Sequence, residues 1–238
     1  MAARLTALAA THARILSRRR TAVLLLALLP LAFYGALYRH SPNAVTVGGV
    51  ASAFSAGGAA IFSMLPARAA DQRLTLAGYR PSVLITGRLI VLEVASLGIS
   101  LLTAAVMVAG TGPPHPADVY AGVILTGLVA VPLGLALGAL LPRELEAVLV
   151  LIGIVGIQIT AGPDTVLSDL LPFHAARQLL DGAVSAPAEF WPQLAATVGY
   201  SIALVGLTWI AWVRRTGPRP QDPITSSRAD RPAGATEP

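Results

Sequence analysis

Six long apolar runs constrain this chain more than any other feature of its sequence. Each run reaches, or nearly reaches, the roughly 20 residues that a helix needs to cross the hydrocarbon core of a bilayer. Only 12% of the residues are charged and 55% are hydrophobic, whereas an average soluble domain has about 25% charged residues. We therefore predict an all-α integral membrane protein with six transmembrane helices within residues 21–213. The runs cover residues 21–38, 44–65, 89–110, 118–141, 147–160 and 191–213.

The positions of the arginines predict the orientation of these helices. The chain contains no lysine, and fifteen of its seventeen arginines fall on one side of the membrane that the apolar runs define. Only Arg39 and Arg177 fall on the other side. Because cytoplasmic loops of membrane proteins are enriched in basic residues, we expect the arginine-rich side and both termini to be cytoplasmic. That side holds Arg4, Arg14, Arg18, Arg19, Arg20, Arg68, Arg73, Arg80, Arg88, Arg143, Arg214, Arg215, Arg219, Arg228 and Arg231.

Both ends of the chain differ in composition from the apolar runs. In residues 1–20, Leu5, Leu8 and Leu16 share one side of a helical wheel, and basic residues gather on another. This pattern favours an amphipathic helix on the inner leaflet, although a basic flank that only orients the first run has the same composition. Residues 214–238 are rich in Pro, Ser, Thr, Arg and Asp, which predicts a disordered cytoplasmic tail.

Small residues recur in the second apolar run. Gly48, Ser52, Ala56 and Ala60 follow one another at intervals of four residues. Such spacing lines one helix face with small side chains and allows another helix to approach closely. The pattern indicates packing within the chain, and a dimer face is the alternative.

Residues 66–88 form the longest connection on the arginine-rich side. Pro66 is suited to the first turn of a helix and Gly78 to its end, and Pro81 then interrupts the chain. We predict a short amphipathic helix followed by a turn; a solvated loop without a partner is the alternative. The charged and polar residues of this segment are Arg68, Asp71, Gln72, Arg73 and Arg80.

Residues 161–190 form a second long connection, on the opposite side. Thirty residues without secondary structure would be unusual in a compact domain. We predict a helix that starts near Pro172 and ends before Gly182, and its apolar residues suggest that it dips into the outer leaflet. Within it, Arg177 and Asp181 have the i,i+4 spacing at which opposite charges meet on a helix.

Several classes of chemistry are excluded by residues that the chain lacks. Without cysteine there are no disulfides or thiolate ligands, and without lysine there is no phosphate-binding GxxxxGK[ST] loop. The four histidines lie in flanks or connections and show no metal-ligand spacing. We expect no catalytic, cofactor or metal site, and any nucleotide would have to be bound by another polypeptide.

Few polar residues lie inside the apolar runs, and such residues are functional candidates. Glu93 is the only carboxylate clearly within a run. It could pair with a neighbouring helix, or contact a substrate or act in gating. Gln158 is expected to form hydrogen bonds within the bundle. Ser52 and Ser55 resemble an intramembrane nucleophile, but no histidine lies in a run to act as its base.

The order of these elements resembles the membrane subunits of ABC-2-type transporters over about residues 1–213. In that family the inner loop commonly has an acidic residue and an arginine, then a Gly/Thr-Leu stretch, a Pro turn and a Gly-basic pair. Here Asp71-Gln72-Arg73-Leu74-Thr75-Leu76-Ala77-Gly78 precedes Pro81 and Gly87-Arg88, with aspartate where glutamate is commoner. Family members also carry a Leu-Pro and a short helix in the outer segment. Leu171-Pro172-Phe173-His174 and residues 177–181 resemble it.

This resemblance implies a permease subunit of an exporter in a bacterial plasma membrane. Two such subunits, identical or different, would pair with separate ATP-binding subunits. The inner loop would be the coupling helix, with Asp71 and Arg73 as polar contacts. The spans lack a charged lumen, so the substrate would be a hydrophobic or amphipathic small molecule such as a drug, antibiotic or lipid.

Three other functions stay open at this point. A secondary, ion-coupled transporter would need intramembrane charges near the midplane, for which Glu93 is available. A membrane scaffold without transport activity would bind partners alone. An intramembrane enzyme would depend on Ser52.

Overall fold

The computed structural model describes residues 20–64, 67–161 and 165–216, and within these ranges every regular element is a helix. The amphipathic helix predicted in residues 1–20 and the tail beyond residue 216 lie outside the described residues. The long helices are α2 (Arg20–Leu37), α3 (Ala44–Met64), α5 (Pro81–Thr111), α6 (Pro116–Leu140), α7 (Glu144–Thr160) and α10 (Phe190–Thr216). The short helices are α4 (Arg68–Leu76), α8 (Val166–Leu170) and α9 (His174–Gly182).

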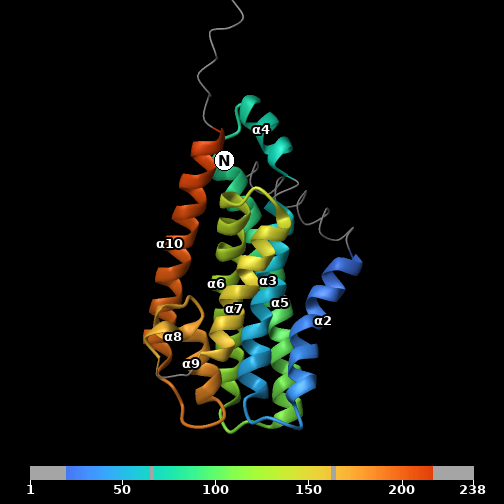
Figure 1. Ribbon diagram of the computed structural model, residues 1–238, viewed down its shortest axis with the longest axis vertical. Coiled ribbons are helices and arrows are strands. Elements are labelled where there is room, and N and C mark those ends of the chain that lie inside the picture. The colour runs from blue at the N-terminus through green and yellow to red at the C-terminus, as the bar shows by residue number, and fades with distance from the viewer. Residues whose placement is uncertain (1–19, 65–66, 162–164, 217–238) are drawn as a thin grey trace, which may run out of the picture.

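The long helices run alternately up and down in one bundle (Figure 1). At one end lie α4, the turn between α6 and α7, and the last turn of α10; we call this the α4 end. At the opposite end lie α8, α9 and the connections that follow α2 and α5; we call this the α9 end. Successive connections therefore lie alternately at the two ends of the bundle. This is the same order in which arginine-rich and arginine-poor connections alternate along the sequence.

Four of the described helices are long and apolar enough to cross a membrane, which agrees with the prediction of a multi-pass helical membrane protein. They are α3, α5, α6 and α10. α7 has 17 residues, and in α2 only Leu28–Leu37 forms a described apolar helix. Six spans therefore stay a prediction, although α2 and α7 lie where the first and fifth runs were expected.

α3 and α6 form the centre of the bundle. Buried residues make up 78% of the apolar stretch of α3 and 83% of that of α6, but only 28% in α5 and 17% in α10. The contact between α3 and α6 is the most extensive between any two helices described. α5 and α10 flank α6 and leave much of their apolar surface on the outside of the bundle.

Glycines bring the backbones of α3 and α6 close together. A Cβ atom added at Gly134 would overlap the carbonyl oxygen of Gly57 and lie 2.7 Å from Cβ of Ala60. One added at Gly138 would lie 2.9 Å from Cβ of Met64. The small residues of α3 thus serve packing within the chain, as predicted, because only residues without bulky side chains permit this approach.

α5 begins eight residues before the apolar run at residue 89 that predicted it. Pro81 occupies its first turn, where a missing N–H costs nothing. The apolar run starts only after Arg88, because arginine is charged. The helix α5 nevertheless continues through Arg88, because its guanidinium is buried and paired with Asp71. α4 and α9 form close to the predicted positions, and Gly78, with a φ of 85°, ends the α4 turn in a conformation that favours glycine.

We expect Gly134→Ala to destabilise the bundle, because the added methyl group meets backbone of α3 that cannot rotate away. A loss of about 1–3 kcal/mol in unfolding free energy is typical of an overpacked core. Thermal unfolding of the purified protein in a mild detergent measures it. Gly153→Ala in α7, where a Cβ would meet nothing within 4 Å, is the matched control. Equal stability of the two variants would contradict the close approach.

Candidate functional site

A buried ion pair joins α4 to the bundle at the α4 end. Nη2 of Arg88, in α5, lies 2.9 Å from Oδ2 of Asp71, in the first turn of α4, and both side chains are almost completely buried. Nη1 of Arg88 contacts Sδ of Met64, the last residue of α3, at 2.9 Å. One guanidinium therefore links three helices, and we call Met64, Asp71 and Arg88 the α4 junction.

This junction holds α4 in one orientation. Removing a charge from water costs several kcal/mol unless a well-placed partner compensates it. Here the compensation depends on α4, so a movement of α4 away from α5 would leave a buried guanidinium without its carboxylate. Thr75 adds a local bond by donating its hydroxyl to the carbonyl oxygen of Asp71 at 2.8 Å. Of the two interpretations of residues 66–88, the structure has the helix and not the unstructured loop.

The remaining polar residues of the predicted coupling segment lie on the surface. Gln72, Arg73 and Arg80 are exposed, and Leu76 has 89% of its surface accessible. The side chain of Arg68 is outside the described part. Asp71 is the exception, because its burial prevents direct contact with another protein. A coupling role for the exposed residues stays a prediction.

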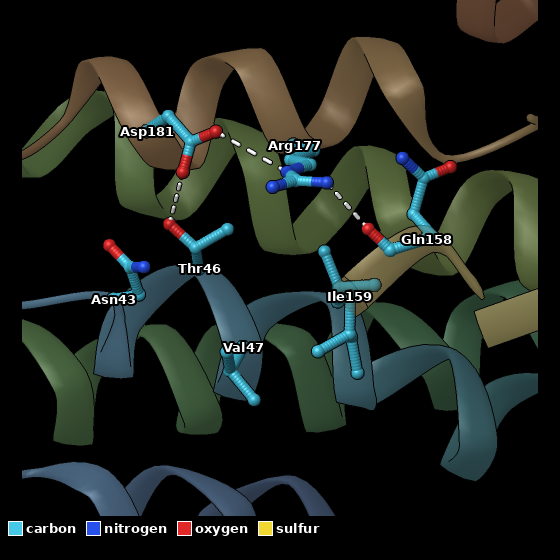
Figure 2. Close-up of a pocket in the computed structure, with 8 residues that line it drawn as sticks. Asn43, Thr46, Val47, Gln158, Ile159, Arg177 and Asp181 are labelled. Atoms are coloured by element: carbon cyan, nitrogen blue, oxygen red, sulfur yellow. Dashed lines mark hydrogen bonds and ion pairs between the residues drawn. The ribbon is translucent and has the colours of Figure 1, made fainter. Parts of the chain in front are cut away.

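At the opposite end, α9 is held to α3 and α7 by polar contacts (Figure 2). Oγ1 of Thr46 donates to Oδ1 of Asp181 at 2.6 Å. Nε of Arg177 lies 3.4 Å from Oδ2 of the same carboxylate, which confirms the predicted i,i+4 pair. Nη1 of Arg177 donates to the carbonyl oxygens of Gln158 and Ala161 at 2.6 Å each. These two carbonyls belong to the C-terminal end of α7, where helical hydrogen bonds run out.

The apolar face of α9 packs into the protein and not into the outer leaflet. Leu179 and Leu180 are fully buried. A Cβ atom at Gly49 of α3 would lie 2.5 Å from Cδ1 of Leu180, and one at Gly122 of α6 would lie 2.6 Å from its Cγ. The leucine thus fills a notch that two glycines leave between the central helices. Sequence alone does not reveal this notch, and the position of α9 relative to the outer leaflet stays a prediction.

A small cavity lies beside these contacts, between α3, α7 and α9. Its volume is about 30 Å³, room for about one water molecule and far less than the several hundred Å³ of a drug-sized site. Gln158 is fully buried beside it; its Nε2 donates to Oγ of Ser168 at 3.4 Å, as expected for a residue bonded within the bundle. The cavity is lined by Asn43, Thr46, Val47, Val50, Gln158, Ile159, Arg177 and Asp181.

The other predicted residues of the outer segment link α8 to α9. His174 begins α9, directly after the Pro172-Phe173 turn. Its Nδ1 lies 3.3 Å from Oγ of Ser168, and its Nε2 lies 3.5 Å from Oδ1 of Asp169. α8 was not predicted, because a five-residue helix carries too little periodicity to stand out. In the described part of the chain, no group of three acidic or histidine residues could hold a metal.

Glu93 lies in α5 and is separate from both the α4 junction and the polar contacts that hold α9. Its side chain is partly buried, and in the described residues its carboxylate has no hydrogen bond or ion pair. Arg88 lies five residues away and is already paired with Asp71. The exposed neighbours of Glu93 are apolar and include Ile90, Val94 and Leu97. Both interpretations of Glu93, the structural and the substrate-contacting one, stay predictions.

No protein-family model matches the chain, and the search of curated proteins found no relative. The resemblance to ABC-2-type permeases thus depends on the order of elements and the residues quoted above.

We expect Asp71→Ala to lower the unfolding free energy by about 3–5 kcal/mol, because it leaves Arg88 charged and buried. The double variant Asp71→Leu/Arg88→Met removes both charges and should recover much of the loss. Denaturant unfolding in mild detergent measures both. The control Glu146→Ala, which removes an exposed partner 3.7 Å from Arg143, should cost under about 1 kcal/mol. A double variant as unstable as the single one would contradict this account.

Leu180→Ala should empty the notch between Gly49 and Gly122 and cost about 2–5 kcal/mol. We also expect faster proteolysis of residues 161–190, because α9 loses its apolar anchor. Leu170→Ala in α8, where the side chain is 69% exposed, is the matched control. If both variants resist protease as the parent does, α9 is not anchored by this contact.

Proposed function

We propose that this chain is the permease subunit of an ATP-binding-cassette exporter. In this proposal it crosses a bacterial plasma membrane six times with both termini in the cytoplasm, and it moves a hydrophobic or amphipathic small molecule. A separate subunit would bind and hydrolyse ATP. A second permease subunit, identical or different, would complete the translocation unit.

The observation that carries the proposal is the α4 junction. A loop that only connects α3 to α5 needs neither an oriented helix nor a buried charge, whose burial costs energy. α4 instead has its acidic residue paired inside the bundle and its other polar residues exposed at the end of the molecule. This is the arrangement that a transmitting element requires, because force applied to α4 reaches α5 and the end of α3 through Arg88.

The distribution of arginines supports the proposed orientation. The segments that meet at the α4 end include α4 itself, the α6–α7 turn with Arg143, and the end of α10 with Arg214 and Arg215. The α9 end has Arg39 and Arg177. The positive-inside rule therefore favours a cytoplasmic α4 end.

The described spans support a lipid-soluble substrate. Away from the helix ends, their charged residues are Arg88, which is paired, and Glu93. The central helices α3 and α6 pack closely through small residues. An aqueous path for ions would need more polar groups along these helices.

An ion-coupled transporter is a second candidate, because Glu93 has no described partner within the bundle. If this candidate is right, transport should follow a proton gradient without ATP, and Glu93→Gln should abolish it. Transport driven by ATP and unaffected by a proton ionophore would exclude it.

The main proposal predicts that an ATP-binding subunit co-purifies with the tagged chain in stoichiometric amount when the chain is purified from its host in two mild detergents. Mass spectrometry identifies it, and a second six-span protein beside it would indicate a heterodimer of permeases. The reconstituted complex should then export substrate only with hydrolysable ATP. Recovery of the chain alone in both detergents would reject the proposal.

A further inference from the structure

A series of hydrogen bonds centred on His174 joins four helices at the α9 end. Nε2 of Gln158, in α7, donates to Oγ of Ser168, in α8, and that oxygen lies 3.3 Å from Nδ1 of His174. On the other side of the imidazole ring, Nε2 lies 2.6 Å from Nε2 of Gln178, one turn further along α9. Nε2 of Gln193, in the first turn of α10, donates to Oε1 of Gln178. We call these five residues the His174 network.

The contact with Gln178 determines which ring nitrogen of His174 holds a proton. An amide nitrogen donates hydrogen bonds and does not accept them, so Nε2 of the imidazole accepts this bond with its lone pair. The proton of the neutral ring then lies on Nδ1, from which it is donated to Ser168. Gln193 determines the orientation of Gln178 in turn, because Oε1 of Gln178 accepts the bond from α10. The network in this form therefore requires an uncharged His174.

A proton added at Nε2 is incompatible with this arrangement. An imidazolium ring has two N–H donors and no acceptor, so its new N–H would point at the NH₂ group of Gln178. Oδ1 of Asp169, in α8, lies 3.5 Å from the same Nε2. A carboxylate is a stronger acceptor for a charged donor than an amide oxygen is. The charged ring therefore pairs with Asp169, and the donors of Gln178 and His174 repel each other.

Asp169 is the charged group best placed to hold the protonated ring. Among the described residues, it is the one that forms an ion pair with His174. Arg177, on α9 itself, is occupied by the carbonyls of α7 and by Asp181. The α6 residues nearest to α9 in the chain begin opposite the other end of that helix, where the backbone N–H of His115 donates to the carbonyl oxygen of Ala183. The titratable or charged residues on and beside the elements packed against α9 are Asp169, Arg177, Asp181, Glu189, Tyr200, His115 and Asp118.

We propose that His174 is a pH-operated link between α9 and α10. While the ring is neutral, Gln178 and Gln193 hold the first turn of α10 to α9. When the ring is protonated, it pairs with Asp169 and the start of α10 is released. Histidine side chains change charge between about pH 5 and 8, and 20% of the side-chain surface of His174 is accessible. The pH of the solution at the α9 end thus controls the link.

α10 is the helix on which the loss of one polar link has the largest effect. Only 17% of its apolar stretch is buried, against 78% for α3 and 83% for α6. Its start is held to the short helices by few polar contacts, of which the bond from the Tyr200 hydroxyl to the carbonyl oxygen of Leu170 is another. This link is independent of the proposed function, since it requires neither an ATP-binding subunit nor a substrate.

The protonation state of His174 is measured by NMR of the full-length protein with ¹⁵N-labelled histidine, in a mild detergent. A ring nitrogen that holds a proton and one that holds a lone pair have different ¹⁵N shifts. We expect the signal that His174→Gln removes to show a proton on Nδ1 alone at about pH 8 and on both nitrogens at about pH 5. A neutral ring with its proton on Nε2 would overturn the proposal.

Hydrogen exchange then tests the release of α10. The parent is compared with His174→Gln at each pH, so that the intrinsic pH dependence of exchange cancels. Between about pH 8 and about pH 5, exchange in the first turns of α10 should rise about twofold to tenfold in the parent relative to His174→Gln, as expected for the loss of one hydrogen bond. Asp169→Asn should move this transition to lower pH, because it removes the charge that attracts the protonated ring. The matched control is His40→Gln, which removes an exposed histidine at the same end and should behave as the parent does.

Two results would reject the link. If the ring is protonated but exchange in α10 does not change, Gln178 and Gln193 have turned over together and still join the helices. If His174→Gln shows the same transition as the parent, another group causes it. Unfolding temperatures of the parent and the variants at both pH values separate local release from loss of the whole fold.

Discussion

The rest of the fold depends on the close approach of α3 and α6 through Gly57 and Gly134. In a bilayer, helices gain little from burying apolar side chains against each other, since lipid is equally apolar, so contact depends on how closely backbones can pack. Glycines supply that closeness along the bundle. The same two helices present Gly49 and Gly122 at the α9 end, where Leu180 fills the gap. Both the core and the seat of α9 therefore derive from positions without side chains.

Charged contacts also secure two of the three short helices, α4 and α9. At the α4 end, Arg88 pairs with Asp71 in a buried site. At the α9 end, Arg177 binds Asp181 and the last carbonyls of α7. The two clusters differ in a way that matters for function. The first leaves α4 with an exposed cationic surface, whereas the second covers the polar end of α7 and lines a cavity of about 30 Å³.

Much of the architecture could be predicted because hydropathy and arginine positions are local signals. The apolar runs lie within a few residues of the helices at most of their ends, and α4 and the Arg177–Asp181 pair were expected. The start of α5 was missed because the charged Arg88 set the N-terminal limit of the apolar run. Asp71, which neutralises Arg88, lies 17 residues earlier in the chain. The sequence does contain a signal for this pair. An acidic residue lies in the preceding loop, and a lone arginine lies at the edge of an apolar run.

The sequence by itself determined the all-helical class, the multi-pass membrane character and the placement of the long helices, because each depends on composition and spacing over a few turns. Only the tertiary structure decided which way Asp71 and Leu180 point and what they meet. Asp71 lies inside the bundle and not on the surface, and the apolar face of α9 packs into the protein and not into lipid. Both outcomes depend on residues far away in the chain, Arg88 in one case and two glycines on different helices in the other. Hydropathy cannot distinguish burial in protein from burial in lipid, since both remove an apolar side chain from water.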